Sequence, residues 1–78
     1  MSESGDKLVK IGELARRFQV LPSTINFYTN EGLLPSDARS PGGYRLYRQT
    51  KALNRLEQIT KLQKQKRWTI EEIKKALK

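Results

Sequence analysis

Two short helical patterns joined by only three residues limit what this chain can fold into. The first runs from Gly12 to Phe18, and its apolar side chains recur at spacings of three and four, which places them on one helix face. The second begins at Pro22, whose fixed backbone angle is already helical and whose missing N–H needs no partner in a first turn. We therefore predict two small helices that meet at a tight turn, the second over residues 22–30.

The second helix is polar on the side that does not anchor it. Ile25 and Tyr28, three residues apart, are predicted to pack inward, and Gly32 suits the left-handed backbone that ends a helix. A largely buried helix, a tight turn and a polar helix make a helix-turn-helix arrangement. The side chains left to point elsewhere are Ser23, Thr24, Asn26 and Phe27.

A glycine turn flanked by arginines follows the second helix. Residues 40–43 are predicted to reverse the chain between Arg39 and Arg45, and the alternation from Tyr44 to Tyr47 indicates a strand or short hairpin. A purely structural role is hard to find for two arginines beside such a turn, so contact with phosphates is favoured. For Tyr44, a place in the core and a phosphate contact through its hydroxyl stay equally open.

Two further helices complete the chain. Apolar residues step by three over residues 49–66, and Thr69 is a suitable N-cap for a fourth helix. Trp68 is expected in the core. The predicted fold class is mainly α, with four helices and a small β-hairpin, in one domain over residues 8–78 that follows a flexible leader over residues 1–7.

The chain is strongly basic, with sixteen Lys and Arg against eight Asp and Glu and a net charge of +8. From Arg39 to Arg67, Glu57 is the sole acid among nine cations. This distribution favours a polyanionic partner such as nucleic acid. A solvated face that keeps a small protein in solution would give the same composition.

The absence of cysteine and histidine excludes a disulfide framework, a zinc finger, a thiol nucleophile and the commonest general base. The carboxylates show no paired arrangement, so we expect neither catalysis nor a metal or other cofactor. No apolar run approaches the roughly 20 residues that cross a bilayer, and residues 1–6 lack the features of a signal peptide. We expect a cytoplasmic, nucleoid-associated protein with no membrane partner.

Five short strings stand in a definite order along the chain. They are Ile11-Gly12-Glu13-Leu14-Ala15, Thr24-Ile25 with Phe27-Tyr28, Glu31-Gly32-Leu33-Leu34, Gly43-Tyr44-Arg45 with Tyr47, and Thr69-Ile70-Glu71-Glu72-Ile73. Taken together, with this order and spacing, they resemble the DNA-binding domain of the MerR family of transcriptional regulators. The resemblance extends from about Leu8 to Leu77.

The resemblance implies a winged helix-turn-helix. In such a domain the helix over residues 22–30 enters the major groove, the hairpin after it is a first wing, and the turn between the third and fourth helices is a second wing. By the resemblance, the recognition helix carries Ser23, Thr24, Asn26, Phe27 and Tyr28. The first wing carries Arg39, Tyr44 and Arg45, and the second wing carries Lys66 and Arg67. Near the flanking phosphates lies Arg16 or Arg17.

Three positions depart from the family pattern. Asn26 stands where the family usually has arginine, and an asparagine can bond an adenine edge through two hydrogen bonds but carries no charge. Leu21 and Arg48 stand where serine N-caps are common. Both helix starts are therefore expected to lose a side-chain acceptor, at about 1 kcal/mol each, and the sequence shows no replacement.

The function implied by the resemblance is sequence-specific binding of double-stranded DNA by a transcriptional regulator or its DNA-binding domain. Two other interpretations stay open. One is an excisionase-like or architectural DNA-binding accessory protein, and the other is a basic module that docks an acidic protein partner or RNA polymerase. A homodimer is expected only through parts absent from this chain, because the family's dimer helix would follow Lys78.

Overall fold

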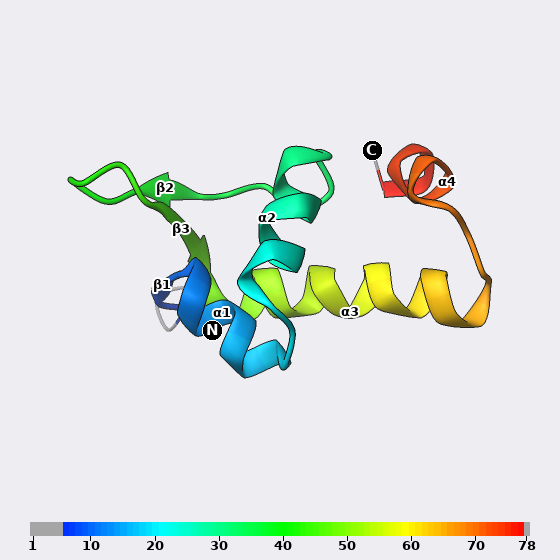
Figure 1. Cartoon of the computed structure of the whole chain (residues 1–78), viewed down its shortest axis with the longest axis horizontal. Coiled ribbons are helices and arrows are strands. Elements are labelled where there is room, and N and C mark those ends of the chain that lie inside the picture. Colours follow the sequence, from blue (N-terminus) through cyan, green and yellow to red (C-terminus); the bar gives the residue numbers. More distant parts are fainter. Residues whose placement is uncertain (1–5, 78) are drawn as a thin grey trace.

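Four helices and a small sheet make up the computed structural model, which describes residues 6–77; residues 1–5, most of the predicted leader, lie outside the described residues. In chain order the elements are β1 (Leu8–Lys10), α1 (Ile11–Phe18), α2 (Pro22–Asn30), β2 (Ala38–Arg39), β3 (Arg45–Arg48), α3 (Gln49–Gln65) and α4 (Ile70–Leu77). α3 lies along the long axis of the molecule, with the hairpin toward one end, α4 toward the other and α2 between them (Figure 1). This arrangement confirms the mainly α fold with a hairpin wing.

The three strands form one antiparallel sheet in the order β1-β3-β2. β2 and β3 form the predicted hairpin, in which Arg39 lies opposite Arg45. β1 pairs with the other edge of β3, so that Val9 lies opposite Tyr47. Because both of these side chains are buried, the sheet ties the base of the hairpin to the core.

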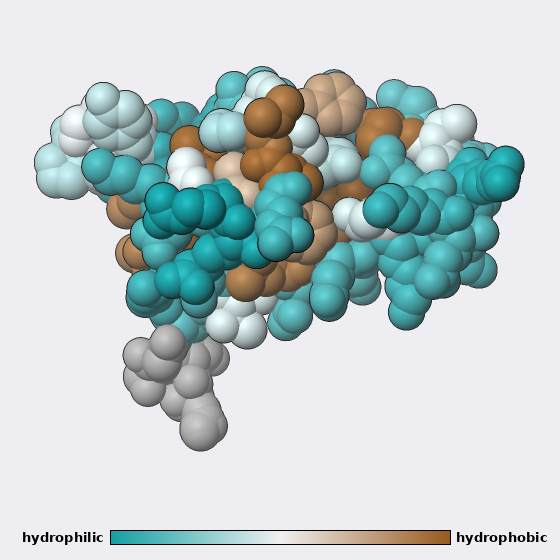
Figure 2. Space-filling view, turned by 60° about the horizontal axis from the view of Figure 1, so that its bottom comes forward, coloured by the Kyte–Doolittle hydropathy of each residue, from teal (hydrophilic) through white to brown (hydrophobic). Residues whose placement is uncertain are grey.

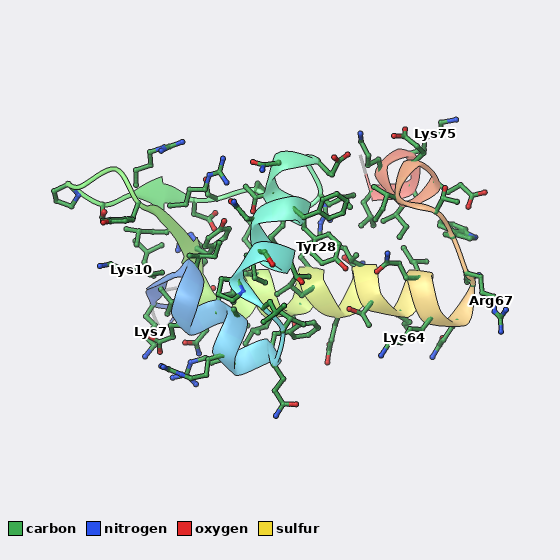
Figure 3. All side chains as sticks on the ribbon, viewed as in Figure 1. Lys7, Lys10, Tyr28, Lys64, Arg67 and Lys75 are labelled. Atoms are coloured by element: carbon green, nitrogen blue, oxygen red, sulfur yellow. The ribbon has the colours of Figure 1, made fainter. Side chains whose placement is uncertain are left out.

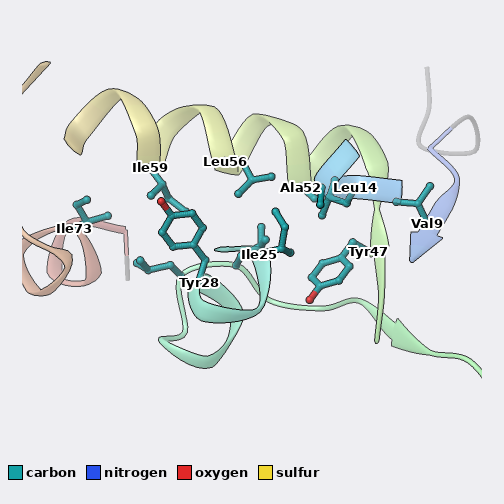
Figure 4. Packing of buried hydrophobic residues seen from close by; sticks show 12 residues of the cluster. Val9, Leu14, Ile25, Tyr28, Tyr47, Ala52, Leu56, Ile59 and Ile73 are labelled. Carbon is teal, nitrogen blue, oxygen red and sulfur yellow. The ribbon is translucent and has the colours of Figure 1, made fainter. Parts of the chain in front are cut away.

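The hydrophobic core joins the sheet to all four helices (Figure 4). Tyr28 of α2 lies beside Ile59 of α3, and Ile73 brings α4 to the same cluster. Trp68 is half-buried and packs against this cluster, as the sequence predicts. Burial of one large apolar side chain stabilises a fold by about 1.5–3 kcal/mol. The largest fully buried side chains are Tyr47, Leu14, Ile25, Leu33, Leu34, Leu56, Ile59 and Ile73.

Local signals end α2 and start α4 as predicted. Gly32 has a φ of +82°, and the Leu33 N–H donates to the Tyr28 carbonyl at 2.9 Å, as in a Schellman ending. Before α4, Thr69 Oγ1 accepts from the Glu72 N–H at 3.2 Å, and the Thr69 N–H donates to Glu72 Oε1 at 2.8 Å. This reciprocal pair is a capping box, which satisfies donors that the helix itself leaves free.

The start of α3 is capped from outside the helix, so the expectation that no residue replaces the missing serine was wrong there. The Asp6 carboxylate accepts from the N–H groups of Thr50 (2.7 Å) and Lys51 (3.3 Å), and the Gln49 N–H donates to the Lys7 carbonyl at 2.9 Å. The hydrogen bond from the Thr50 N–H is the main reason that the pKa of Asp6 lies below its ordinary value. At the start of α2 the N-cap residue makes no side-chain hydrogen bond, as expected.

Candidate nucleic-acid interface

α2 presents a polar outer face. Ser23 and Asn26 are exposed, Thr24 is half-buried, and Phe27 keeps 45% of its surface exposed. Asn30 is also exposed, one helical turn beyond Asn26. The residues predicted from the sequence did not include Asn30, although its spacing of four from Asn26 is the signal that would have identified it.

Tyr28 belongs to the opposite face of α2. Its ring is buried, and its hydroxyl donates to Gln63 Oε1 of α3 at 3.0 Å. Burial raises the pKa of Tyr28. Figure 3 shows the side chain directed from α2 toward the interior rather than toward solvent. Tyr28 is therefore a core residue that supports the helix, and we leave it out of the interface.

The hairpin wing is a tight turn with an exposed tip. The Ser40 N–H donates to the Tyr44 carbonyl and the Gly43 N–H to the Ser40 carbonyl, both at 2.8 Å, and Gly43 has a φ of +88°. Arg39 Nη1 donates to the Gly43 carbonyl at 3.0 Å. Tyr44 is 64% exposed, and Lys10 Nζ lies 5.2 Å from its ring centroid. Tyr44 is thus a surface residue of the wing and not part of the core.

Arg45 connects the wing to α2. Its Nη1 donates to Asn26 Oδ1 at 2.7 Å, and its Nη2 donates to Asn30 Oδ1 at 3.2 Å. The guanidinium therefore spans one turn of α2 with its two terminal nitrogens. The wing and the outer face of α2 consequently form one connected surface.

A groove of about 650 Å³ lies between α2 and the wing. An adjoining depression of about 780 Å³ shares Ile11, Tyr44 and Arg45 with it and adds Lys10 and Arg16 of the β1–α1 region. The groove is lined mainly by polar and cationic side chains, whereas the lining of the depression also includes Leu8, Val9, Leu46 and the acidic Glu13. The groove can therefore receive an anionic ligand. The groove itself is lined by Ile11, Pro22, Ser23, Asn26, Asn30, Arg39, Gly43, Tyr44 and Arg45.

Asp37 fixes the base of the wing to the start of α3. Its carboxylate accepts from the Arg48 N–H at 3.0 Å and from Lys51 Nζ at 2.9 Å. Desolvation acts to raise the pKa of Asp37, but the hydrogen bonds from Arg48 and Lys51 and their charges outweigh it, so this pKa lies below its ordinary value. An ionised Asp37 thus holds the hairpin in position beside the helices.

The turn between α3 and α4, which the resemblance predicts to be a second wing, lies at the other end of the molecule. Arg67 has a φ of +56° in the turn after α3, and its side chain points away from the fold (Figure 3). Lys66 Nζ lies 5.8 Å from the Trp68 ring centroid. In the face drawn in Figure 2, hydrophilic residues cover one end of the molecule, the other end is nearly neutral, and hydrophobic residues gather between them. The predicted wing cations therefore sit far apart, with α2 between them.

The cations differ in whether an acid already neutralises them. Ion pairs within residues 6–77 engage Lys7 and Arg17 with Glu13, Lys51 with Asp37, and Lys74 with Glu31 and Glu71. Of the two predicted flanking residues, Arg17 is thus paired, whereas Arg16 is exposed and lines the depression beside the wing. In the described part of the chain no carboxylate forms an ion pair with Arg16, Arg39, Arg45, Lys66 or Arg67.

The part of the chain that the structure describes holds neither a metal-binding cluster nor a helix that could cross a membrane. No three acidic side chains there lie close enough together to hold a metal ion. None of the helices over residues 6–77 combines the length and the apolar character that crossing a membrane requires.

Several known proteins resemble this chain. The Mercuric resistance operon regulatory protein of Bacillus cereus is 40% identical over 68 residues, which cover 87% of this chain and 50% of the relative. The HTH-type transcriptional regulator ZntR of Escherichia coli (strain K12) is 40% identical over 40 residues, which cover 51% of this chain and 28% of the relative. The chain therefore spans half or less of the length of these curated relatives.

Solved structures agree with the sequence relatives. HiNmlR, a MerR family regulator lacking the sensor domain and bound to promoter DNA, superposes with a TM-score of 0.77 at 27% identity, covering 91% of this chain and 55% of that one. The transcription regulator PbrR691 from Ralstonia metallidurans CH34, in complex with lead(II), gives a TM-score of 0.74 at 42% identity, covering 88% and 52%. The sequence pattern of the MerR HTH family regulatory proteins matches residues 9–78. With its winged fold and this match over nearly its whole length, the chain belongs to the MerR family.

Proposed function

We propose that this chain binds double-stranded DNA sequence-specifically as the DNA-binding part of a transcriptional regulator. In this proposal α2 enters the major groove, the hairpin wing contacts the phosphates on one side, and Lys66 and Arg67 contact them on the other. DNA binding takes place at the nucleoid in the cytoplasm and involves no catalytic step. The structure of HiNmlR, which superposes on this chain, is bound to promoter DNA, and this supports the proposal.

The observation that carries the proposal is the connected groove between α2 and the wing. Its lining offers amide and hydroxyl groups, from Ser23, Asn26 and Asn30, that can exchange hydrogen bonds with base edges. The same lining includes Arg39, and the adjoining depression includes Arg16, and neither arginine forms an ion pair with a carboxylate among the described residues. Neutral hydrogen-bonding groups flanked by free cations are what a surface needs to read bases while phosphates fix its register.

The test is selection from a random duplex library by this chain, followed by titrations at several salt concentrations. We expect an enriched motif. We also expect that Arg39→Ala weakens binding to every duplex and lowers the slope of log K against log[salt] by about one, because one phosphate contact is lost. Lys61→Ala, at an exposed position of α3 remote from the groove, is the matched control and should leave the slope unchanged.

Two outcomes would contradict the proposal. Recovery of the library without any enriched motif would leave only nonspecific attraction to a polyanion. Equal effects of Arg39→Ala and Lys61→Ala on the salt slope would mean that net charge, and not the wing, determines binding. Either result would favour the interpretation of the basic surface as a dock for an acidic protein.

A further inference from the structure

One guanidinium group holds two asparagine side chains on the outer face of α2. Arg45 donates from Nη1 to Asn26 Oδ1 at 2.7 Å and from Nη2 to Asn30 Oδ1 at 3.2 Å. Asn26 and Asn30 are exposed and line the groove together with Arg45. The residue at the position where the family resemblance expects arginine is therefore coupled to an arginine that comes from the wing.

The chemistry of the groups dictates how the two amides are turned. An arginine side chain has only donors, whereas an asparagine amide has an accepting oxygen and a donating nitrogen. Only the amide oxygens can therefore face Arg45, and each NH₂ group is directed away from the guanidinium. A charged donor at 2.7 Å makes a strong hydrogen bond, so the orientation of Asn26 is held more firmly than that of a free surface amide.

We propose that Arg45 is a positioning residue that presents Asn26 to DNA as a hydrogen-bond donor. The proposal rests on the proposed function, in which α2 lies in the major groove. A donating NH₂ group is matched best by base edges that present only acceptors, which are guanine O6 and N7 or thymine O4, because adenine carries a donating amino group beside its N7 acceptor. The usual pairing of asparagine with adenine needs Oδ1 to accept from the adenine amino group, and here one of the two acceptor positions of Oδ1 already receives the hydrogen bond from Arg45.

The wing then determines specificity without touching a base. Arg45 keeps further donors for a phosphate, so it can contribute to affinity and orient Asn26 at the same time. Arg39 offers the matched comparison, because it belongs to the same wing and carries the same charge but bonds only to the Gly43 carbonyl of the wing itself among the described residues.

The experiment is selection from a random duplex library with the wild-type chain and four variants. Asn26→Ala identifies the base position that depends on Asn26, because the preference there should disappear. At that position the wild type should select guanine or thymine over adenine by on the order of tenfold. Arg45→Lys keeps the charge but cannot span both amides, so it should admit adenine there, whereas Arg39→Lys should not.

Asn26→Asp supplies a second, independent readout. Its carboxylate keeps one oxygen on Arg45 and directs the other toward the groove, so the chain should change its preference to cytosine, whose amino group donates. Denaturation of each variant shows that it is folded. Selection of adenine by the wild type, or an unchanged preference in Arg45→Lys, would overturn this inference while leaving the proposed function intact. Failure of the wild type to enrich any motif would overturn both.

Discussion

Arg55 is a structural cation within the basic second half of the chain. From α3, its Nε donates to the Leu33 carbonyl at 2.8 Å and its Nη2 to the Leu77 carbonyl at 3.1 Å. One side chain thus ties the segment after α2 and the end of α4 to the central helix. Its positive charge also lies at the C-terminal end of α4, where the helix dipole favours a cation.

We expect Arg55→Met to lower the free energy of unfolding by about 2–3 kcal/mol. Hydrogen bonds from charged donors contribute about 1.5–3 kcal/mol each. We take the lower end of this range for each of the two bonds because Arg55 is only half-buried. In a domain of this size each 1 kcal/mol changes the melting temperature by about 4–8 °C, which gives a decrease of roughly 10–20 °C. Methionine keeps most of the aliphatic stem, so the loss reports the two hydrogen bonds.

The assay is denaturant unfolding followed by circular dichroism, with Arg55→Lys and Arg39→Met alongside. Lysine can reach one carbonyl but not both, so it should recover about half of the loss. Arg39→Met should change stability by less than about 0.5 kcal/mol because Arg39 is exposed on the wing. The reasoning is refuted if Arg55→Met unfolds at the wild-type denaturant concentration, or if it lowers the salt slope of DNA binding.

Two further predictions concern the helix ends. The pKa of Asp6 is lowered in the folded protein, so its carboxylate stabilises the fold above the ordinary pKa of 3.8, and this stabilisation is lost as the pH falls through the lower pKa of the folded state. Asp6→Asn should therefore be less stable than the wild type at neutral pH. The difference between their denaturant midpoints should disappear in acid. A gap that is independent of pH would show that the carboxylate charge plays no part. Gly32→Ala should lower the free energy of unfolding by about 1 kcal/mol because Gly32 has a φ of +82°, which an alanine adopts only with strain. An added Cβ would meet no atom within 4 Å, so the backbone angle alone causes the loss. Gly12→Ala, in the first turn of α1 with equally open space, should be neutral or stabilising.

Much of the fold could be predicted from the sequence because its signals are local. The capping box of Thr69 and Glu72 and the left-handed Gly32 involve residues within a few positions of one another. The spacing of Ile25 and Tyr28 likewise identified the anchoring side of α2, because helix geometry alone places them on one face. The family resemblance then identified these elements as parts of a MerR-family domain, and the comparisons confirm that the chain belongs to this family.

The sequence could not decide which aromatic residue of the hairpin is buried. Tyr44 and Tyr47 both stand near the glycine turn, and strand alternation places them on opposite faces without saying which face is inside. The pairing of β1 with β3 puts Tyr47 opposite the buried Val9, which leaves Tyr44 on the surface beside Lys10. That outcome depends on a segment almost forty positions away, so no local pattern contains it.

The sequence by itself therefore determined the order of the helices, the end of α2, the start of α4 and the place of the arginine-flanked hairpin, since each follows from signals between near neighbours in the chain. Only the tertiary structure decided that Asp6 caps α3 across a separation of 44 residues and that Arg45 turns toward Asn26 and Asn30 instead of toward solvent. Both contacts join charged or polar groups from distant segments. They exist because core packing brings those segments together, and packing is a property of the whole chain.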